Sequence, residues 1–174
     1  NIAVVTHAGG PAVMLTDALE KGGLEVPQIK GEKAEELKEQ LFPGSSVENP
    51  IDFLATGTAE QLDLILEYCD KHFDNIDGVA VIFGTPGLVK VFDAYRVIDE
   101  KMKTARKPIY PILPSINEAA EEVKDFLQKG RINFPEEVLL GNALSKIYYT
   151  DKPAKSRAEL PQTDVKEARR IIDS

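Results

Sequence analysis

Short apolar runs alternate with helix-like stretches along most of this chain. The runs are rich in β-branched and other apolar side chains, which is typical of buried strands in a parallel sheet. Pro27 lies inside one of them and favours an irregular or edge strand there. We expect about five strands, at residues 2–5, 24–29, 79–83, 109–113 and 131–134.

Between these runs, apolar residues recur with the spacing of amphipathic helices. The clearest helix opens with a capping box of Thr58 and Gln61, and Ser115 with Glu118 forms a second box further along. Pro135 is suited to the first turn of a later helix. The clearest helix carries its apolar stripe at Leu62, Ile65, Leu66, Cys69 and Phe73. Further helices are expected at residues 11–21, 32–41, 88–105, 115–129, 135–149 and 164–173.

The alternation of strands and helices predicts an α/β fold. We expect a three-layer open parallel sheet of flavodoxin-like size, with helices on both faces. Residues 1–150 are assigned to this domain, and residues 151–174 to a proline- and charge-rich linker with a terminal helix. Because the sequence enters its first strand at once, we expect it to be a fragment of a longer protein.

Composition limits the kinds of partner. The formal net charge of −8 argues against nucleic acid, whose phosphate backbone needs a basic face. A small anion is compatible with this charge, because backbone N–H groups hold anions inside acidic proteins. No apolar run approaches the roughly 18 residues of a membrane span. The single Cys69 excludes an internal disulfide and a multi-cysteine metal site, and it favours a cytoplasmic location.

A short glycine-rich loop, residues 7–11, follows the first strand. Ligands of open parallel sheets bind outside the carboxyl ends of the strands, where this loop is expected. Glycines let a backbone approach a ligand closely, and Pro11 suits the first helical turn. We assign unsatisfied N–H groups at the positive end of the helix dipole to Ala12 and Val13. A tight turn without a ligand explains the same pattern. The predicted phosphate site comprises Ala8, Gly9, Gly10, Pro11, Ala12 and Val13.

Two further loops are expected at the same edge of the sheet. Residues 84–87, Gly-Thr-Pro-Gly, follow a strand, and Thr85 adds a hydroxyl donor. Residues 49–52, Asn-Pro-Ile-Asp, are either a turn tied to the backbone by Asp52 or a wall of the cleft. Neither glycine-rich loop matches the P-loop or the dinucleotide-binding fingerprint. The expected cleft lining is Thr6, His7, Asn49, Asp52, Gly84, Thr85 and Gly87.

His7 is the residue at this edge best suited to acid–base or nucleophilic chemistry. The sequence names no carboxylate partner for it, so we expect it to line the cleft and to donate to phosphate. His72 lies among charges and is expected to be solvated, and Cys69 is expected in the core. No catalytic residue and no metal site are therefore assigned within the chain.

Several segments together resemble one family of ligases. They are residues 3–11 (Ala-Val-Val-Thr-His-Ala-Gly-Gly-Pro), 17–19, 23–25, 49–52 and 77–83. Over the domain assigned above, the chain is similar to the NDP-forming acyl-CoA synthetases. This family includes the ADP-forming acetyl-CoA synthetases and is related to succinyl-CoA synthetase. The resemblance implies the second flavodoxin-like domain of such an enzyme, which is a succinyl-CoA synthetase-like domain.

Enzymes of this family interconvert acyl-CoA, ADP and phosphate with acid, CoA and ATP, through a histidine that carries the phosphoryl group. That histidine belongs to a preceding domain, in a Ser-Ser-His-Thr-Gly-like segment that this chain lacks. The resemblance implies that residues 9–12 direct a helix N-terminus at the phosphohistidine. The family usually has Asn at the position of His7, which gives His7 a supporting part. The segment after Leu160 looks like the connector to an ATP-grasp module.

For the whole protein, the resemblance implies ATP or ADP, Mg²⁺ and CoA, and it implies no cofactor bound by this chain alone. The expected partners are the CoA-binding, phosphohistidine and ATP-grasp domains or subunits, and the isolated chain is expected to be inactive. An alternative is a non-catalytic regulatory or scaffolding module, as in fusions with protein acetyltransferases. An FMN-binding flavodoxin is disfavoured, because the chain has no Trp and its first loop few hydroxyl groups. The acid substrate, the choice between ATP and GTP and the oligomeric state stay open.

Overall fold

The computed structural model describes residues 1–85, 92–115, 117–152 and 164–173. Within these residues the chain forms a four-stranded parallel sheet in the order β2-β1-β3-β4. The register pairs Thr6 with both Asp52 and Ile82, so the carboxyl ends of three strands meet at one edge. The strands are β1 (Ile2–Thr6), β2 (Ile51–Asp52), β3 (Gly78–Ile82) and β4 (Ile109–Ile112).

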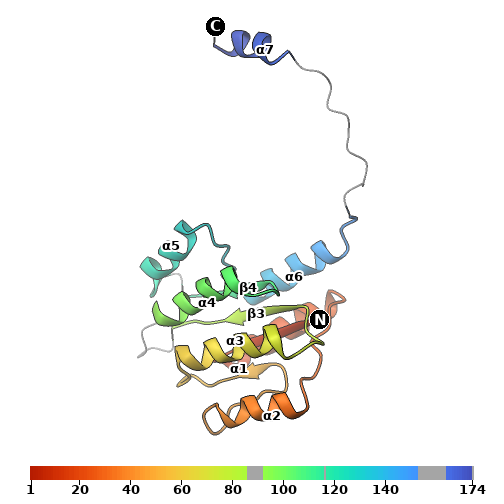
Figure 1. Cartoon of the computed structure of the whole chain (residues 1–174), viewed down its shortest axis with the longest axis vertical. Coiled ribbons are helices and arrows are strands. Elements are labelled where there is room, and N and C mark those ends of the chain that lie inside the picture. The colour runs from red at the N-terminus through yellow and green to blue at the C-terminus, as the bar shows by residue number, and fades with distance from the viewer. Residues whose placement is uncertain (86–91, 116, 153–163, 174) are drawn as a thin grey trace.

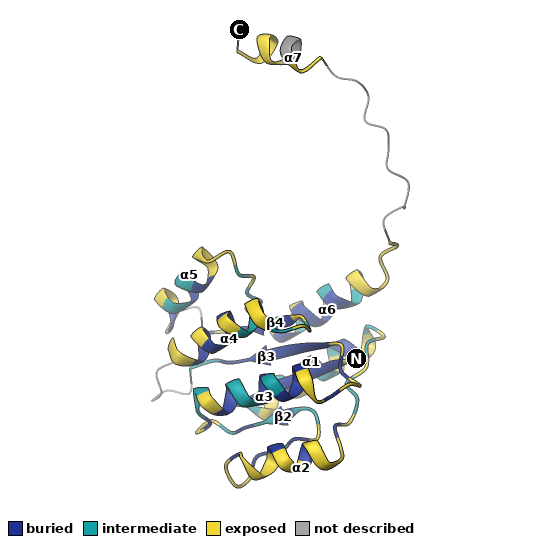
Figure 2. Ribbon diagram, in the orientation of Figure 1, coloured by how far each residue is buried: buried dark blue, intermediate teal, exposed yellow. Residues whose placement is uncertain are grey.

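Helices cover both faces of the sheet (Figure 1). Successive residues of β1 point to opposite faces: Val4 packs with Leu15 under α1 and α6, and Val5 packs with Ile65 under α2 to α5. Figure 2 shows the buried residues gathered along the sheet and on the inner sides of these helices. The predicted three-layer α/β fold is confirmed. None of the described helices has the length and apolar character needed to cross a membrane. The helices are α1 (Gly9–Lys21), α2 (Glu32–Glu39), α3 (Ala59–Lys71), α4 (Phe92–Thr104), α5 (Ala120–Gln128), α6 (Glu137–Tyr148) and α7 (Val165–Ile172).

α1 and α6 lie in close contact because Gly141 has no side chain. A Cβ atom added to Gly141 would lie 2.6 Å from the Cβ of Ala18. One turn further along, the Ser145 hydroxyl donates to the Gly22 carbonyl at 3.0 Å, where α1 ends. α6 therefore holds α1 against the sheet along the second half of its length.

Three strand predictions are wrong. Residues 24–29 form no strand, and they join β1 through a bond from Ile2 N to the Glu25 carbonyl at 2.8 Å. The strand predicted at residues 131–134 is reduced to an isolated bridge between Phe134 and β4. β2 lies in a segment that the sequence pattern assigns to a loop. All three depend on contacts between distant segments, which local periodicity does not record.

The starts of two helices also differ from the predictions. α5 begins only after Ala119, which makes no side-chain cap, so the capping box predicted at Ser115 is wrong. α6 begins later than its predicted start at Pro135. The described part of the helix predicted at residues 88–105 is α4, and residues 86–91 lie outside the described residues.

Candidate functional site

The carboxyl edge of the sheet brings together residues from three loops. His7 follows β1, Asp52 ends β2 and Gly84 follows β3. A Cβ atom added to Gly9 would lie 3.6 Å from Asp52 Oδ2, and one added to Gly84 would lie 3.9 Å from His7 Cε1. The start of α1, an imidazole and a carboxylate are therefore neighbours at this edge.

The turn between β1 and α1 is held by the side chain of Thr6. Thr6 is fully buried, and its hydroxyl oxygen accepts from Ala8 N–H at 3.0 Å and donates to the Ala8 carbonyl at 2.8 Å. The Ala8 amide is therefore already bonded. This arrangement differs from the predicted roles, in which Thr6 lines the cleft and Ala8 binds phosphate.

α1 begins at Gly9, which is earlier than its predicted start at Pro11. In an α-helix an N–H bonds to the carbonyl four residues earlier, so the amides of Ala12 and Val13 are bonded within the helix. The predicted assignment of these two amides to a ligand is wrong. The donors at the helix N-terminus are instead the amides of Gly9 and Gly10, since Pro11 has no N–H. The helix has no side-chain cap and no acidic residue in its first turn.

Asp52 ties its turn to the backbone, which is one of the two roles that the sequence left open. Its Oδ1 accepts from Leu54 N–H at 2.9 Å, which ties the turn after β2. Its Oδ2 lies beside Gly9, close to the positive end of the α1 dipole. An anion that binds at Gly9 therefore shares this end of the helix with a carboxylate.

His7 is held by the end of β3. Its Nδ1 lies 3.4 Å from the Ile82 carbonyl oxygen, and its ring packs on Phe83 with the ring centroids 4.6 Å apart. Burial lowers the pKa of His7 below its ordinary value, while the Ile82 carbonyl and the charge of Asp52 oppose this effect. The imidazole is therefore neutral at neutral pH.

Ser115 is a residue of this edge that the sequence reasoning missed. It is buried after β4, and its hydroxyl accepts from Thr85 N–H at 2.7 Å and lies 2.8 Å from the Thr85 hydroxyl oxygen. Ser115 Oγ also lies close to Gly84, because a Cβ atom added to Gly84 would lie 3.3 Å from it. Ser115 therefore holds the loop beside His7. The position of Ser115 at a strand end was the available signal. The predicted cleft residue Gly87 lies outside the described residues.

The structure places Asn49 beside the first half of β1 and not at the carboxyl edge. Its side-chain oxygen accepts from Val4 N–H at 2.8 Å. Its side-chain nitrogen donates to the carbonyls of Ile2 at 3.0 Å and Pro27 at 2.9 Å. Asn49 thus binds backbone groups, and the prediction that it lines the cleft is wrong.

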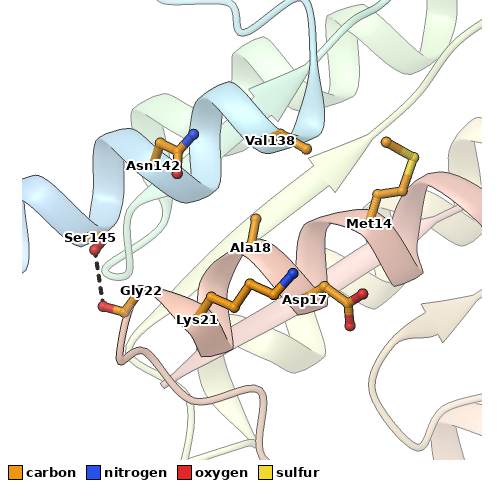
Figure 3. A pocket seen from close by; sticks show the side chains of 8 residues that line it. All are labelled: Met14, Asp17, Ala18, Lys21, Gly22, Val138, Asn142 and Ser145. Carbon is orange, nitrogen blue, oxygen red and sulfur yellow. Dashed lines mark hydrogen bonds between the residues drawn. The ribbon is translucent and has the colours of Figure 1, made fainter.

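A hollow of about 420 Å³ lies between α1 and α6 (Figure 3). It contains none of the residues predicted to bind phosphate or to line the cleft. Among the described residues, no group of three or more His, Cys, Asp or Glu side chains is placed to hold a metal ion. The hollow is lined by Met14, Asp17, Ala18, Lys21, Gly22, Val138, Asn142 and Ser145.

The fold and this edge define a class of protein: an open parallel α/β domain with an uncapped helix N-terminus at the carboxyl ends of its strands. No family model matches the chain. The chain is 28% identical over 136 residues to the alpha subunit of ADP-forming acetate–CoA ligase II from Pyrococcus furiosus, covering 75% of this chain and 29% of that subunit. It is 34% identical over 82 residues to ADP-forming acetate–CoA ligase I from Archaeoglobus fulgidus, covering 47% of this chain and 12% of that ligase.

A solved structure shares this fold. It is the dinucleotide forming acetyl-coenzyme A synthetase 1 of Ca. Korarchaeum cryptofilum in complex with phosphate and ADP. The TM-score is 0.72 at 24% identity, and the match covers 85% of this chain and 32% of that one. The chain thus spans less than a third of the length of each of these relatives. The relatives confirm the resemblance to the NDP-forming acyl-CoA synthetases.

Proposed function

We propose that this chain is one domain of an NDP-forming acid–CoA ligase and that it holds a phosphoryl group at the N-terminus of α1. The longer enzyme interconverts acyl-CoA, ADP and phosphate with acid, CoA and ATP. A histidine of another domain carries the phosphoryl group, and the nucleotide, Mg²⁺ and CoA bind outside this chain. Residues 1–150 form the domain, and residues 151–174 lead to a further module in the cytoplasmic enzyme.

One observation carries this proposal. α1 begins at the carboxyl edge with no side-chain cap and no acidic residue in its first turn, so the amides of Gly9 and Gly10 are its first donors. Backbone amides at the positive end of a helix hold phosphate without rearrangement, which suits stabilisation of charge during phosphoryl transfer. The acetate–CoA ligases among the relatives, and the solved relative in complex with phosphate and ADP, support the proposal that the longer protein is an ADP-forming ligase.

Cys69, the single cysteine of the chain, has no part in this chemistry. Cys69 is fully buried on α3, and burial raises the pKa of its thiol to about 12. The thiolate that would attack a substrate is therefore absent at neutral pH. The contribution of this domain is electrostatic, and the groups that form covalent bonds belong to other domains.

Replacement of Gly10 tests the proposed donor. Gly10→Pro removes one amide hydrogen, and proline is tolerated in the first helical turn. Gly10→Ala is the matched control, because it keeps the N–H and its Cβ meets nothing within 4 Å. We expect Gly10→Pro to weaken phosphate binding about tenfold, through loss of one charge-assisted hydrogen bond. Gly10→Ala should bind as the wild type does.

The measurement is a titration with inorganic phosphate, followed by NMR of the backbone amides, with folding checked by circular dichroism. We expect the largest shifts at Gly9 and Gly10. Equal phosphate affinity of Gly10→Pro and Gly10→Ala, or shifts confined to other parts of the chain, would contradict the proposed site.

A further inference from the structure

We propose that His7 takes up a proton when a dianionic phosphoryl group binds at Gly9 and Gly10, and that this proton lets the dianion lie beside Asp52. The inference rests on the proposed function, because it concerns the same anion. It adds a selective property to this edge of the sheet, which binds phosphoryl dianions more tightly as the pH falls.

In the tautomer with its hydrogen on Nδ1, the neutral ring of His7 cannot donate to a phosphate. Its Nδ1 lies 3.4 Å from the Ile82 carbonyl oxygen, and a carbonyl oxygen only accepts, so this contact favours that tautomer. In a neutral imidazole the other nitrogen, Nε2, then has a lone pair and only accepts. In this tautomer, a donor role for His7 toward phosphate requires a second proton on the ring.

Asp52 makes a dianion unfavourable here unless a positive charge accompanies it. Its Oδ2 lies beside Gly9, at the end of α1 where the phosphoryl group is proposed to bind. Like charges at such separations repel each other, and the repulsion grows where water is excluded. A proton on His7 adds one positive charge and an Nε2–H group at the same edge of the sheet, where the charge of Asp52 already acts on the ring.

In the part of the chain that the structure describes, Asp52 is the charged side chain that acts on His7. β3 and the residue after it contribute the Ile82 carbonyl and the Phe83 ring. Tyr95 of α4 reaches this layer through a bond from its hydroxyl to the Phe83 carbonyl at 3.4 Å, and burial raises its pKa to about 12, so it is neutral. The loops after β3 and β4 add hydroxyl groups that are bonded to each other.

The direction of the pH effect follows from these contacts. Burial keeps the pKa of free His7 low, and a bound dianion raises the pKa because it favours the charged ring. The bound state then holds a proton that the free state lacks, so affinity falls as the pH rises. The proton comes from solvent: the neutral ring, one H⁺ and the dianion give an imidazolium–dianion pair, with no other bond changed.

Sulfate is the probe for this experiment, because it stays a dianion where phosphate itself titrates. Calorimetry of the full chain in buffers of different ionisation enthalpy counts the protons taken up. We expect uptake that approaches one proton per sulfate, and binding about tenfold weaker near pH 8 than near pH 6. Ring NMR signals follow the protonation of His7 with and without sulfate, and the exposed His72 is the internal control.

His7→Asn is the matched variant, since its amide keeps a donor but takes up no proton. We expect it to bind sulfate without proton uptake and with an affinity independent of pH. Wild-type binding that shifts the amides of Gly9 and Gly10 without proton uptake would overturn the inference and leave the proposed function standing. If neither sulfate nor phosphate shifts these amides, the proposed function fails, and the inference fails with it.

Discussion

At the scale of single residues, the Asn49 side chain makes the hydrogen bonds to β1 that a residue of a neighbouring strand would make. On β1, β2 pairs with Val5 and Thr6, and the Asn49 amide bonds to Val4 and Ile2 in the first half of the strand. Its backbone φ of 71° lies in the left-handed region, which Asn adopts more readily than most residues. Both the side chain and the conformation therefore favour Asn at this position.

Substitutions of Asn49 separate these two effects. Asn49→Ala loses three hydrogen bonds and places Ala at positive φ, and we expect the free energy of unfolding to fall by about 3 kcal/mol. Asn49→Gly loses the same bonds but tolerates the backbone, so it should cost about 1 kcal/mol less. Urea denaturation measures both. A cost for Asn49→Gly equal to or above that of Asn49→Ala would show that the backbone conformation contributes nothing.

The residues of the candidate site differ in how far the sequence predicted them. The sequence places His7 at this edge because His7 follows a predicted strand, whereas it leaves Asp52 either as the tie of a turn or as part of the cleft wall. Thr6 and Ser115 were assigned other roles, because their bonds run to the backbones of Ala8 and Thr85 in three dimensions. Local patterns identify which residues reach a strand end, and they do not identify which of them bond to a neighbouring loop.

At the scale of elements, the contact between α1 and α6 leaves no room for a side chain at Gly141. Gly141 sits where a Cβ atom would lie 2.6 Å from the Ala18 Cβ and 3.3 Å from the Ala18 carbonyl carbon. Separation of the helices would disturb the core around Leu15 and Leu140. The close approach also holds α1, whose first turn forms part of the candidate site.

Gly141→Ala should destabilise the protein, although Ala is the better helix former by about 1 kcal/mol. We expect a net loss of about 1–2 kcal/mol in thermal or urea unfolding, because overpacking outweighs the gain in helix propensity. Ala18→Gly in the same chain removes the nearest clashing atom, so the double variant should show a favourable coupling energy. Additive effects of the two substitutions would mean that the helices do not meet at this point.

Strong local signals decided which elements the sequence predicted correctly. The capping box of Thr58 and Gln61 and the apolar stripe that follows it gave α3, whose cap is present. The apolar runs gave β1, β3 and β4. β2 has two residues and is defined by its pairing with β1, so no pattern within residues 49–54 specifies it.

At the scale of the whole molecule, the domain exposes apolar side chains on α1 and α6, the two helices between which the hollow of Figure 3 lies. Val13 and Met14 of α1 and Leu139 of α6 are each about half exposed or more. Exposed apolar faces of this kind are expected where a domain meets the rest of a longer protein. The chain covers less than a third of each relative compared above, which fits this interpretation.

Because the proposal assigns the phosphorylated histidine and the nucleotide site to other domains, we expect this chain alone to be inactive. Incubated with acetate, CoA, ATP and Mg²⁺, it should form no acetyl-CoA above a blank without protein, because the proposed nucleophile and nucleotide site lie elsewhere. Mass spectrometry of acetyl-CoA checks this outcome, and the longer protein serves as the positive control. Turnover by the isolated chain would refute the electrostatic role assigned to α1.

The Asn49 side chain has a further consequence for behaviour at high concentration. An open strand edge is a template on which other chains can add strands, and this is one route to aggregation. Because β2 is short, the first half of β1 would form such an edge if the Asn49 amide did not bond to the Ile2 carbonyl and Val4 N–H and the Glu25 carbonyl did not accept from Ile2 N–H. The Asn49 side chain, together with the Glu25 carbonyl, therefore serves as a barrier to intermolecular strand addition along the first half of β1.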